Sequence, residues 1–268
     1  MNEVKLIKYP RTPHLEGSRL QPGDEDLSQI PFSDIAGKHL VVEEKCDGAN
    51  SAISFDFNGR LLIQSRGHYL NGGYRERHYD LLKQWASIHR NALYGALGSR
   101  YILYGEWMYA KHTVYYDLLP HYFLEFDILD RETGRFLDTP TRHKMLHAVP
   151  VVSAPVLKEG SFQDKEDLIK LLGHSNYISD RHFEHLREIS RTLELEEDRQ
   201  CRETDPSTDM EGLYIKIEED GQVTGRLKFV RHGFFQAVQL SDSHWQTRPI
   251  VPNRLAIPLD ALFAGKLP

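Results

Sequence analysis

The pattern of hydrophobic and polar positions predicts a pair of strands early in the chain. Apolar residues at every second position over 51–57 lie on one face of a strand. Asn58-Gly59 follows directly, and this pair is a strong signal for a two-residue hairpin turn. Residues 60–65 then form the return strand. Just upstream, 39–44 (His-Leu-Val-Val-Glu-Glu) also has the composition of a strand.

The rest of the chain mixes helical and strand patterns without a regular order. Apolar residues recur at helical spacing over 75–97, and Gly98 closes this helix. Further elements are expected as strands at 101–108, 121–129, 151–157, 212–218 and 223–231, and as helices at 164–172 and 179–195. Four prolines make residues 1–37 irregular. This mixture predicts an α+β fold of mixed, mostly antiparallel sheets with flanking helices.

Composition narrows the class of protein. A chain of 268 residues with 40% hydrophobic residues can bury a substantial core. The two cysteines, Cys46 and Cys201, are too few for a disulfide scaffold, and no apolar run approaches the roughly 20 residues of a membrane span. We therefore expect a cytoplasmic protein without a membrane partner. The net charge of −6 argues against a general basic coat for nucleic acid but allows a local basic groove.

The sharpest chemical feature is the segment Glu44-Lys45-Cys46-Asp47-Gly48-Ala49-Asn50. A lysine at the end of a strand meets a tight Asp-Gly turn, which can hold its amine at the mouth of a pocket. Taken alone, the segment is equally consistent with a solvated lysine before a hairpin turn. Segments further along the chain favour the interpretation in which the lysine lies in a pocket.

Four further segments follow in strand contexts: 104–107 (Tyr-Gly-Glu-Trp), 123–128 (Phe-Leu-Glu-Phe-Asp-Ile), 211–216 (Glu-Gly-Leu-Tyr-Ile-Lys) and 226–231 (Arg-Leu-Lys-Phe-Val-Arg). Together with the lysine segment, they resemble in order motifs I, III, IIIa, IV and V of the covalent nucleotidyltransferases. That superfamily contains ATP-dependent RNA and DNA ligases and messenger-RNA capping enzymes. Each motif is weak by itself, but five in order with plausible spacing are specific.

The resemblance implies a covalent lysyl–AMP at Lys45. An attacking amine must lose its proton, and nearby cations lower a lysine pKa. Lys216, Lys228 and a bound Mg²⁺, for which Mn²⁺ can substitute, are expected to supply those cations and to neutralise the α-phosphate of ATP. Glu211 and Asp47 provide the hard oxygen ligands that Mg²⁺ prefers.

The remaining site residues follow from the same resemblance. Phe126 is expected to stack on adenine, Glu106 to bind the ribose hydroxyls and Glu44 to contact the adenine edge through its backbone. Three further residues are expected to bind nucleotide or nucleic-acid ends: Asn50, Arg66 and Arg226. Each also has an ordinary interpretation, as a core aromatic or an exposed strand residue.

The branch of the superfamily is indicated by three features. Only 37 residues follow Arg231, too few for the 70–100 or so residues of an OB fold, which DNA ligases and capping enzymes carry. Asn50 resembles the end of motif I in RNA-editing-type RNA ligases, and Gln64-Ser65-Arg66-Gly67 resembles motif Ia. Those ligases more often have His than Asp at position 47 and Lys than Arg at position 226, which is a departure here.

The sequence thus predicts an ATP-dependent RNA ligase that joins 3′-hydroxyl and 5′-phosphate ends. Such a ligase would work with a separate end-healing kinase or phosphatase. Residues 1–268 are expected to form one adenylyltransferase domain, with a largely helical insertion at 139–205 and a short tail at 232–268. The basic, proline-rich N-terminal segment is expected either to fold across the site or to be a solvated terminus. The alternatives are a minimal DNA ligase and a non-catalytic nucleotide or nucleic-acid-end binder.

Overall fold

The strand that ends at Lys45 and the strand that follows it belong to different halves of one mixed sheet. The computed structural model describes residues 5–20, 23–24, 26–234 and 249–264, and their strands form a 12-stranded sheet. The first half has the order β10-β3-β11-β12, with β10 (Val156–Ser161), β3 (His39–Lys45), β11 (Gly212–Glu219) and β12 (Gln222–Val230). All neighbours in this half are antiparallel.

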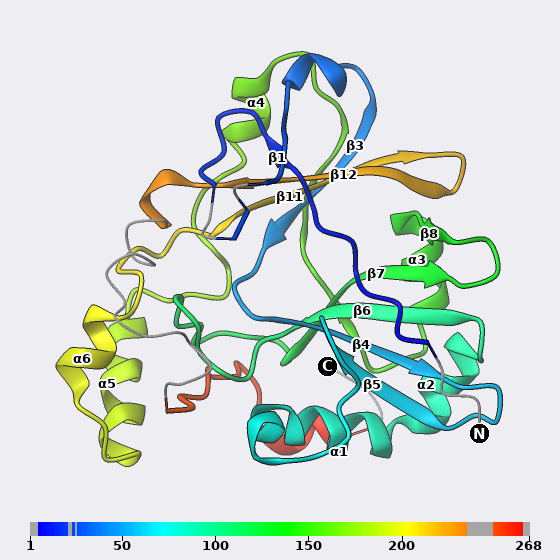
Figure 1. The fold of residues 1–268 in the computed structure, drawn as a ribbon. Coiled ribbons are helices and arrows are strands. Elements are labelled where there is room, and N and C mark those ends of the chain that lie inside the picture. The colour runs from blue at the N-terminus through cyan, green and yellow to red at the C-terminus, as the bar shows by residue number, and fades with distance from the viewer. Residues whose placement is uncertain (1–4, 21–22, 25, 235–248, 265–268) are drawn as a thin grey trace.

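The second half contains the predicted hairpin. Its order is β8-β7-β6-β4-β5, with β8 (Arg135–Leu137), β7 (Phe123–Asp130), β6 (Tyr101–Trp107), β4 (Ala49–Phe55) and β5 (Leu61–Ser65). The short strand β8 joins the halves because it pairs with β7 on one side and β12 on the other. The link between β3 and β4 therefore crosses from one half to the other (Figure 1).

Three short strands lie beside these main strands. They are β1 (His14–Leu15), β2 (Gln29–Ile30) and β9 (Val152–Ser153). β1 is parallel to β12 and β2, and β9 is parallel to β7, whereas every other pair in the sheet is antiparallel among the described residues. The predicted mixed, mostly antiparallel sheet with helices is thus confirmed.

Helices cover the second half of the sheet from below in Figure 1. The segment after β5 forms a 3₁₀ helix (Tyr74–Tyr79), α1 (Asp80–Ile88) and α2 (Arg90–Leu97). Trp85 and Leu93 of these helices are buried with Ile53 and Leu103 of the sheet in the larger hydrophobic core. The single helix predicted over 75–97 is wrong, since the chain kinks at His89, whose ring nitrogen is 2.9 Å from the backbone oxygen of Leu262.

A second core supports the half that carries β3. Leu40 and Val42 of β3 pack with Leu213 and Ile215 of β11. Helix α4 (Lys165–Ile169) and the 3₁₀ helix Phe32–Asp34 close this core through Leu168 and Phe32.

The segment 139–205 differs from the expected helical insertion. It does contain helices, which are α3 (Thr139–Leu146), α4, α5 (His182–Thr192) and α6 (Glu197–Arg202). However, it also supplies β9 and β10, and β10 pairs with the central strand β3. The predicted strand at 151–157 is accordingly split into two, because each piece pairs with a different half of the sheet.

Residues near both ends of the described chain make backbone or side-chain contacts with the rest of the fold. In the N-terminal segment, which was predicted to be irregular, His14 is paired in parallel with Lys228. Near the other end, Asn253 is buried and accepts a hydrogen bond from the Tyr116 backbone at 3.0 Å. The predicted tail at 232–268 is therefore, where described, part of the structure around β6 and β7. No helix among the described residues has the length and apolar character to cross a membrane.

Candidate active site

The crossover between the two sheet halves forms the floor of a large cleft. Its volume is about 2040 Å³. Nine of the eleven residues singled out from the sequence line it: Glu44, Lys45, Asp47, Asn50, Arg66, Glu106, Phe126, Glu211 and Lys228. These residues come from strands β3, β4, β6, β7 and β12 and from connections between strands, so the fold gathers motifs that are far apart in sequence.

Lys45 is held by a buried carboxylate. Its Nζ lies 2.7 Å from Oε2 of Glu211, whose side chain is 1% exposed, while the Lys45 side chain is 22% exposed. The register explains the contact, because Gly212, the residue after Glu211, pairs directly with Lys45. Burial raises the pKa of Glu211 to about 7, although the Lys45 charge opposes this rise.

The charge state of Lys45 in the protein alone is set by the carboxylates around it. Burial by itself lowers the pKa of the amine, but the carboxylates of Glu211, Glu106 and Asp47 outweigh burial, and the pKa is raised. In the protein alone, Lys45 is therefore an ammonium ion. The predicted fall in its pKa requires added positive charge in the cleft that offsets these carboxylates.

Glu106 lies on β6 opposite Asn50 of β4. Burial raises the pKa of Glu106 to about 8, with Glu211 and Asp47 adding to the rise and Lys45 opposing it. Three carboxylates thus repel one another around one lysine. Hard oxygen donors carrying excess negative charge fit a divalent cation such as Mg²⁺. The described residues contain no cluster of three His, Cys, Asp or Glu side chains that would hold a metal alone.

Asp47 has a positioning contact that the sequence did not reveal. Its Oδ2 accepts hydrogen bonds from the backbone of Thr113 at 2.7 Å and Val114 at 2.9 Å. Its own backbone N–H donates to the Tyr116 hydroxyl at 2.9 Å. Asp47 therefore fixes the loop after β6 to the crossover, with one carboxylate oxygen committed to this loop.

The close approach of the crossover to β6 requires glycine at position 48. A Cβ built there would lie 2.7 Å from Sδ of Met108, 2.8 Å from the backbone oxygen of Trp107 and 2.9 Å from Cγ of Glu106. We expect Gly48→Ala to destabilise the fold by about 1–3 kcal/mol, as overpacking commonly does, and to displace Glu106.

Urea unfolding measures this effect. The matched control is Gly95→Ala, since Gly95 is an exposed residue of α2 with no heavy atom within 4 Å of the added Cβ. That change is expected to leave stability unchanged or to raise it by about 0.4–1 kcal/mol. Equal stability of the two variants would contradict the close packing at position 48.

Lys228 reaches the cleft from β12 and is paired with the N-terminal segment. Its ammonium forms an ion pair with Asp24, and Asp24 also lies 3.1 Å from His14 Nε2. Burial lowers the pKa of Lys228, the contact with Asp24 opposes this, and the charge of Lys45 adds to the decrease. Lys8, Arg11 and Asp24 also line the cleft, so described residues of the N-terminal segment form part of its wall.

Phe126 and Glu44, which were expected to contact adenine, both have protein partners in the structure. The Phe126 ring lies in the cleft wall, with its centroid 5.1 Å from that of Tyr9 and 6.1 Å from that of Tyr214. The Glu44 backbone N–H donates a hydrogen bond to the Pro155 backbone oxygen. The Glu44 carboxyl accepts a hydrogen bond from the Ser175 hydroxyl at 2.5 Å. Burial raises the pKa of Glu44 to about 7.

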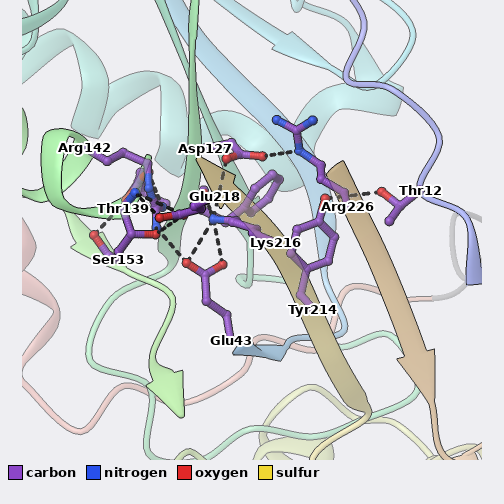
Figure 2. Close-up of polar contacts among 12 residues, drawn as sticks. Thr12, Glu43, Asp127, Thr139, Arg142, Ser153, Tyr214, Lys216, Glu218 and Arg226 are labelled. Atoms are coloured by element: carbon purple, nitrogen blue, oxygen red, sulfur yellow. Dashed lines mark hydrogen bonds and ion pairs between the residues drawn. The ribbon is translucent and has the colours of Figure 1, made fainter. Parts of the chain in front are cut away.

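Lys216 and Arg226 do not lie with Lys45, contrary to the expectation for Lys216. The Lys216 ammonium is fully buried, 2.9 Å from Glu43 and 3.5 Å from Asp127. Arg226 Nε lies 2.9 Å from the same Asp127 (Figure 2). Both cations face the interior because each is an inward position on its strand and neutralises buried carboxylates of neighbouring strands.

A further buried cation, Arg142 of α3, was not predicted. It lies between Glu43 and Glu125, each at 2.6 Å, and all three side chains are 0% exposed (Figure 2). Breaking a buried pair of this kind commonly costs about 3–5 kcal/mol. Because Glu43 is two residues before Lys45, this network fixes the strand that carries the lysine. The sequence gives no local signal for it, since Arg142 and Glu43 lie 99 residues apart.

Comparisons with known proteins identify a family and similar folds. The family model described as RNA ligase matches residues 38–230. A comparison with curated protein sequences gives no match. The fold of this chain is similar to several solved structures of an RNA ligase from Naegleria gruberi. A mutant with ATP and Mn has a TM-score of 0.55 and 15% identity over 88% of this chain and 59% of that chain.

Two more structures of that ligase give the same result. The form with pyrophosphate has a TM-score of 0.54 and 16% identity over 87% of this chain and 58% of that chain. A mutant with AMP and Mn has a TM-score of 0.54 and 15% identity over 88% and 59%. This chain thus spans less than two thirds of the matched ligase. The likeness shows a shared fold, and the family model covers most of the sequence: the chain belongs to the RNA ligase family.

Proposed function

We propose that this chain is an ATP-dependent RNA ligase with the nucleotidyltransferase fold, which joins RNA 3′-hydroxyl and 5′-phosphate ends. One observation carries the proposal. Lys45 Nζ lies 2.7 Å from the buried Glu211 on the floor of a cleft that Glu106 and Lys228 also line. The proposal is supported by membership in the RNA ligase family and by the ATP, AMP and pyrophosphate held by the similar Naegleria structures.

In the first step, Lys45 Nζ attacks the α-phosphorus of ATP. A P–N bond forms, the bond from phosphorus to pyrophosphate oxygen breaks, and the amine gives up its proton. Lys228 neutralises charge on the phosphate oxygens, since its ammonium is the cation of β12 that reaches the cleft. The Phe126 ring and the Glu106 carboxylate are placed to meet the adenosine.

A divalent metal fits the carboxylate side of the cleft. Glu211 and Asp47 are the proposed ligands, Asp47 through its remaining oxygen. When bound, Mg²⁺ or Mn²⁺ offsets the negative charge that raises the Lys45 pKa and withdraws charge from the phosphate. Burial raises the pKa of Glu106 to about 8, and the neighbouring Glu211 and Asp47 carboxylates add to this rise. A cation held by Glu211 and Asp47 would offset their contribution.

The second and third steps transfer AMP and seal the strand. An oxygen of the RNA 5′-phosphate attacks the AMP phosphorus, the P–N bond breaks, and Lys45 is regenerated. The 3′-hydroxyl oxygen then attacks the 5′-phosphorus, loses its proton and releases AMP. Asn50 and Arg66 are the proposed contacts to the RNA ends, because both line the cleft on the β4–β5 side of Lys45.

We expect a clear preference for RNA at the 3′-hydroxyl strand, because the ribose 2′-hydroxyl is a donor and acceptor that a protein can read. The test compares nick sealing for the four RNA and DNA strand combinations at one salt concentration. The 5′-phosphate strand should matter less, since its phosphate is the reacting group. Equal or faster sealing of the all-DNA nick would favour the minimal DNA ligase instead.

The proposal also includes a partner enzyme, a cellular location and a domain organisation. Ends with a 5′-phosphate and 3′-hydroxyl must be prepared, so an end-healing kinase or phosphatase is the proposed partner. A cytoplasmic location and a single adenylyltransferase unit over 1–268 are proposed with it. In this unit, 139–205 is proposed as an insertion whose β10 joins the catalytic sheet.

A further inference from the structure

The loop between β5 and α1 forms one wall of the cleft and has no role in the steps above, apart from Arg66. It runs from 66 to 79 and links the hairpin to the helical layer (Figure 1). Most of its residues line the same cleft as Lys45. Its sequence, Arg-Gly-His-Tyr-Leu-Asn-Gly-Gly-Tyr-Arg-Glu-Arg-His-Tyr, contains both basic and aromatic residues.

The loop has a defined internal structure. The Glu76 carboxylate accepts hydrogen bonds from the backbone of Asn71 at 3.3 Å and Gly72 at 2.8 Å. Gly72 and Gly73 have φ values of 107° and 121°, which side chains with a Cβ rarely adopt. The chain therefore turns sharply before the 3₁₀ helix and presents the first residues of that helix outward.

This turn leaves a basic surface on an acidic protein. The Lys83 ammonium lies 2.9 Å from Glu76, so the one acidic residue of the loop is neutralised from behind. Arg66, Arg75 and Arg77 are all exposed. The loop thus carries concentrated positive charge at the cleft, although the whole chain has a net charge of −6.

Tyr74 gives the surface an aromatic platform. It is a large aromatic residue exposed to solvent, with 78% of its surface accessible. The Arg77 guanidinium lies 4.4 Å from the ring centroid, which orients the ring and covers one face only. An exposed ring with an arginine on one side is a poor core residue but a suitable stacking partner for a planar base.

We propose that this loop binds the RNA next to the joining site, with an unpaired base stacked on Tyr74 and phosphates on Arg75 and Arg77. This inference rests on the proposed ligase function, because it assumes that RNA ends enter the cleft. The chemistry favours RNA over a protein partner. Single-stranded RNA is bound through aromatic stacking combined with arginine contacts to phosphate, and both groups are present within four residues here.

The test measures binding by fluorescence anisotropy of the full chain without ATP. Two probes are compared: a 12-nucleotide single-stranded RNA and an abasic ribose-phosphate chain of equal length. Tyr74→Ala should weaken binding of the RNA at least about fivefold, as loss of one base stack does. It should leave binding of the abasic chain unchanged, and Tyr74→Phe should bind RNA like the unmodified protein.

Arg75→Ala has a separate signature. It should weaken both probes and reduce the slope of log affinity against log salt by about 0.7, the value for one phosphate contact on a single strand. The matched controls are Phe57→Ala and Arg60→Ala. Phe57 is an 88% exposed aromatic in the β4–β5 turn, and Arg60 is an exposed arginine beside it. Neither control should change the affinity.

A second measurement distinguishes failure of the RNA-binding loop from failure of the ligase function. It is the intact mass of the protein after incubation with ATP and Mg²⁺. Normal AMP labelling with no effect of Tyr74→Ala on RNA binding would overturn the loop site and leave the ligase function standing. An equal loss for Phe57→Ala, or an equal loss on the abasic chain, would also overturn it. A base-dependent loss at Tyr74 without AMP labelling would support the RNA site and remove the ligase function.

Discussion

Replacing Lys45 with alanine is expected to abolish covalent adenylylation completely. The unmodified protein should gain the mass of one AMP when incubated with ATP and Mg²⁺. Lys45→Ala should not, because the amine at the cleft floor is the only proposed nucleophile. Lys45→Arg should fail as well, since a guanidinium stays protonated and has no free electron pair for attack. Intact mass spectrometry measures all three proteins directly.

The control for this experiment lies at the other end of the same strand. Lys38 is exposed and immediately precedes β3, so Lys38→Ala removes the same charge without touching the cleft floor. It should label like the unmodified protein. Labelled Lys45→Ala would show that the nucleophile is another residue. An unlabelled native protein would favour the non-catalytic binder with the same fold.

Glu211→Ala is expected to slow adenylylation by about 10²–10³, the usual cost of losing one preorganised charged group at a reaction centre. Its carboxylate contacts Lys45 at 2.7 Å and faces the proposed metal, so both the amine and the cation lose a partner. The single-turnover rate of AMP labelling measures this effect. Folding should be little changed, because burial already makes the ionised carboxylate costly and raises its pKa to about 7.

Two further variants separate charge from position at Glu211. Glu211→Gln keeps the size and the acceptor oxygen near Lys45 but removes the negative charge, and it should be nearly as slow as alanine. Glu219→Ala removes an exposed carboxylate from the other end of β11 and should react normally. Near-normal labelling by Glu211→Gln would assign Glu211 to orienting Lys45 and remove it from the metal site.

Elements with local signals were predicted well from the sequence. Asn58 and Gly59 do lie in the turn that joins β4 to β5, and Gly59 has a φ of 72°. The connection is longer than the predicted two-residue turn, because the nearest strand pair is Phe55 with Leu61. Asp220-Gly221 likewise turns β11 into β12, with φ values of 51° and 78°. These turns succeed because their backbone conformation depends on two adjacent residues. The ordered motifs were informative for the same reason, since each is a short segment at the end of a strand.

Elements that depend on distant partners were predicted less well. The helix at 75–97 is broken where His89 meets a backbone oxygen near the C-terminal end of the described chain. The strand at 151–157 is divided between two sheet halves. Helical and strand periodicity records which face of an element is apolar. It contains no information on which remote segment will cover that face.

The sequence by itself determined most of the main strands, the positions of the hairpin turns and the chemical types gathered around Lys45. Tertiary structure decided which of the cations serve the cleft. Lys216 and Lys228 both alternate with apolar residues on adjacent strands, yet Lys216 is buried against Glu43 and Asp127, whereas Lys228 reaches the cleft. The physical reason is that a buried ammonium must be neutralised. Its partners come from β3, which pairs with β11, and from β7 in the other half of the sheet, and their positions relative to β11 are fixed only when the sheet assembles.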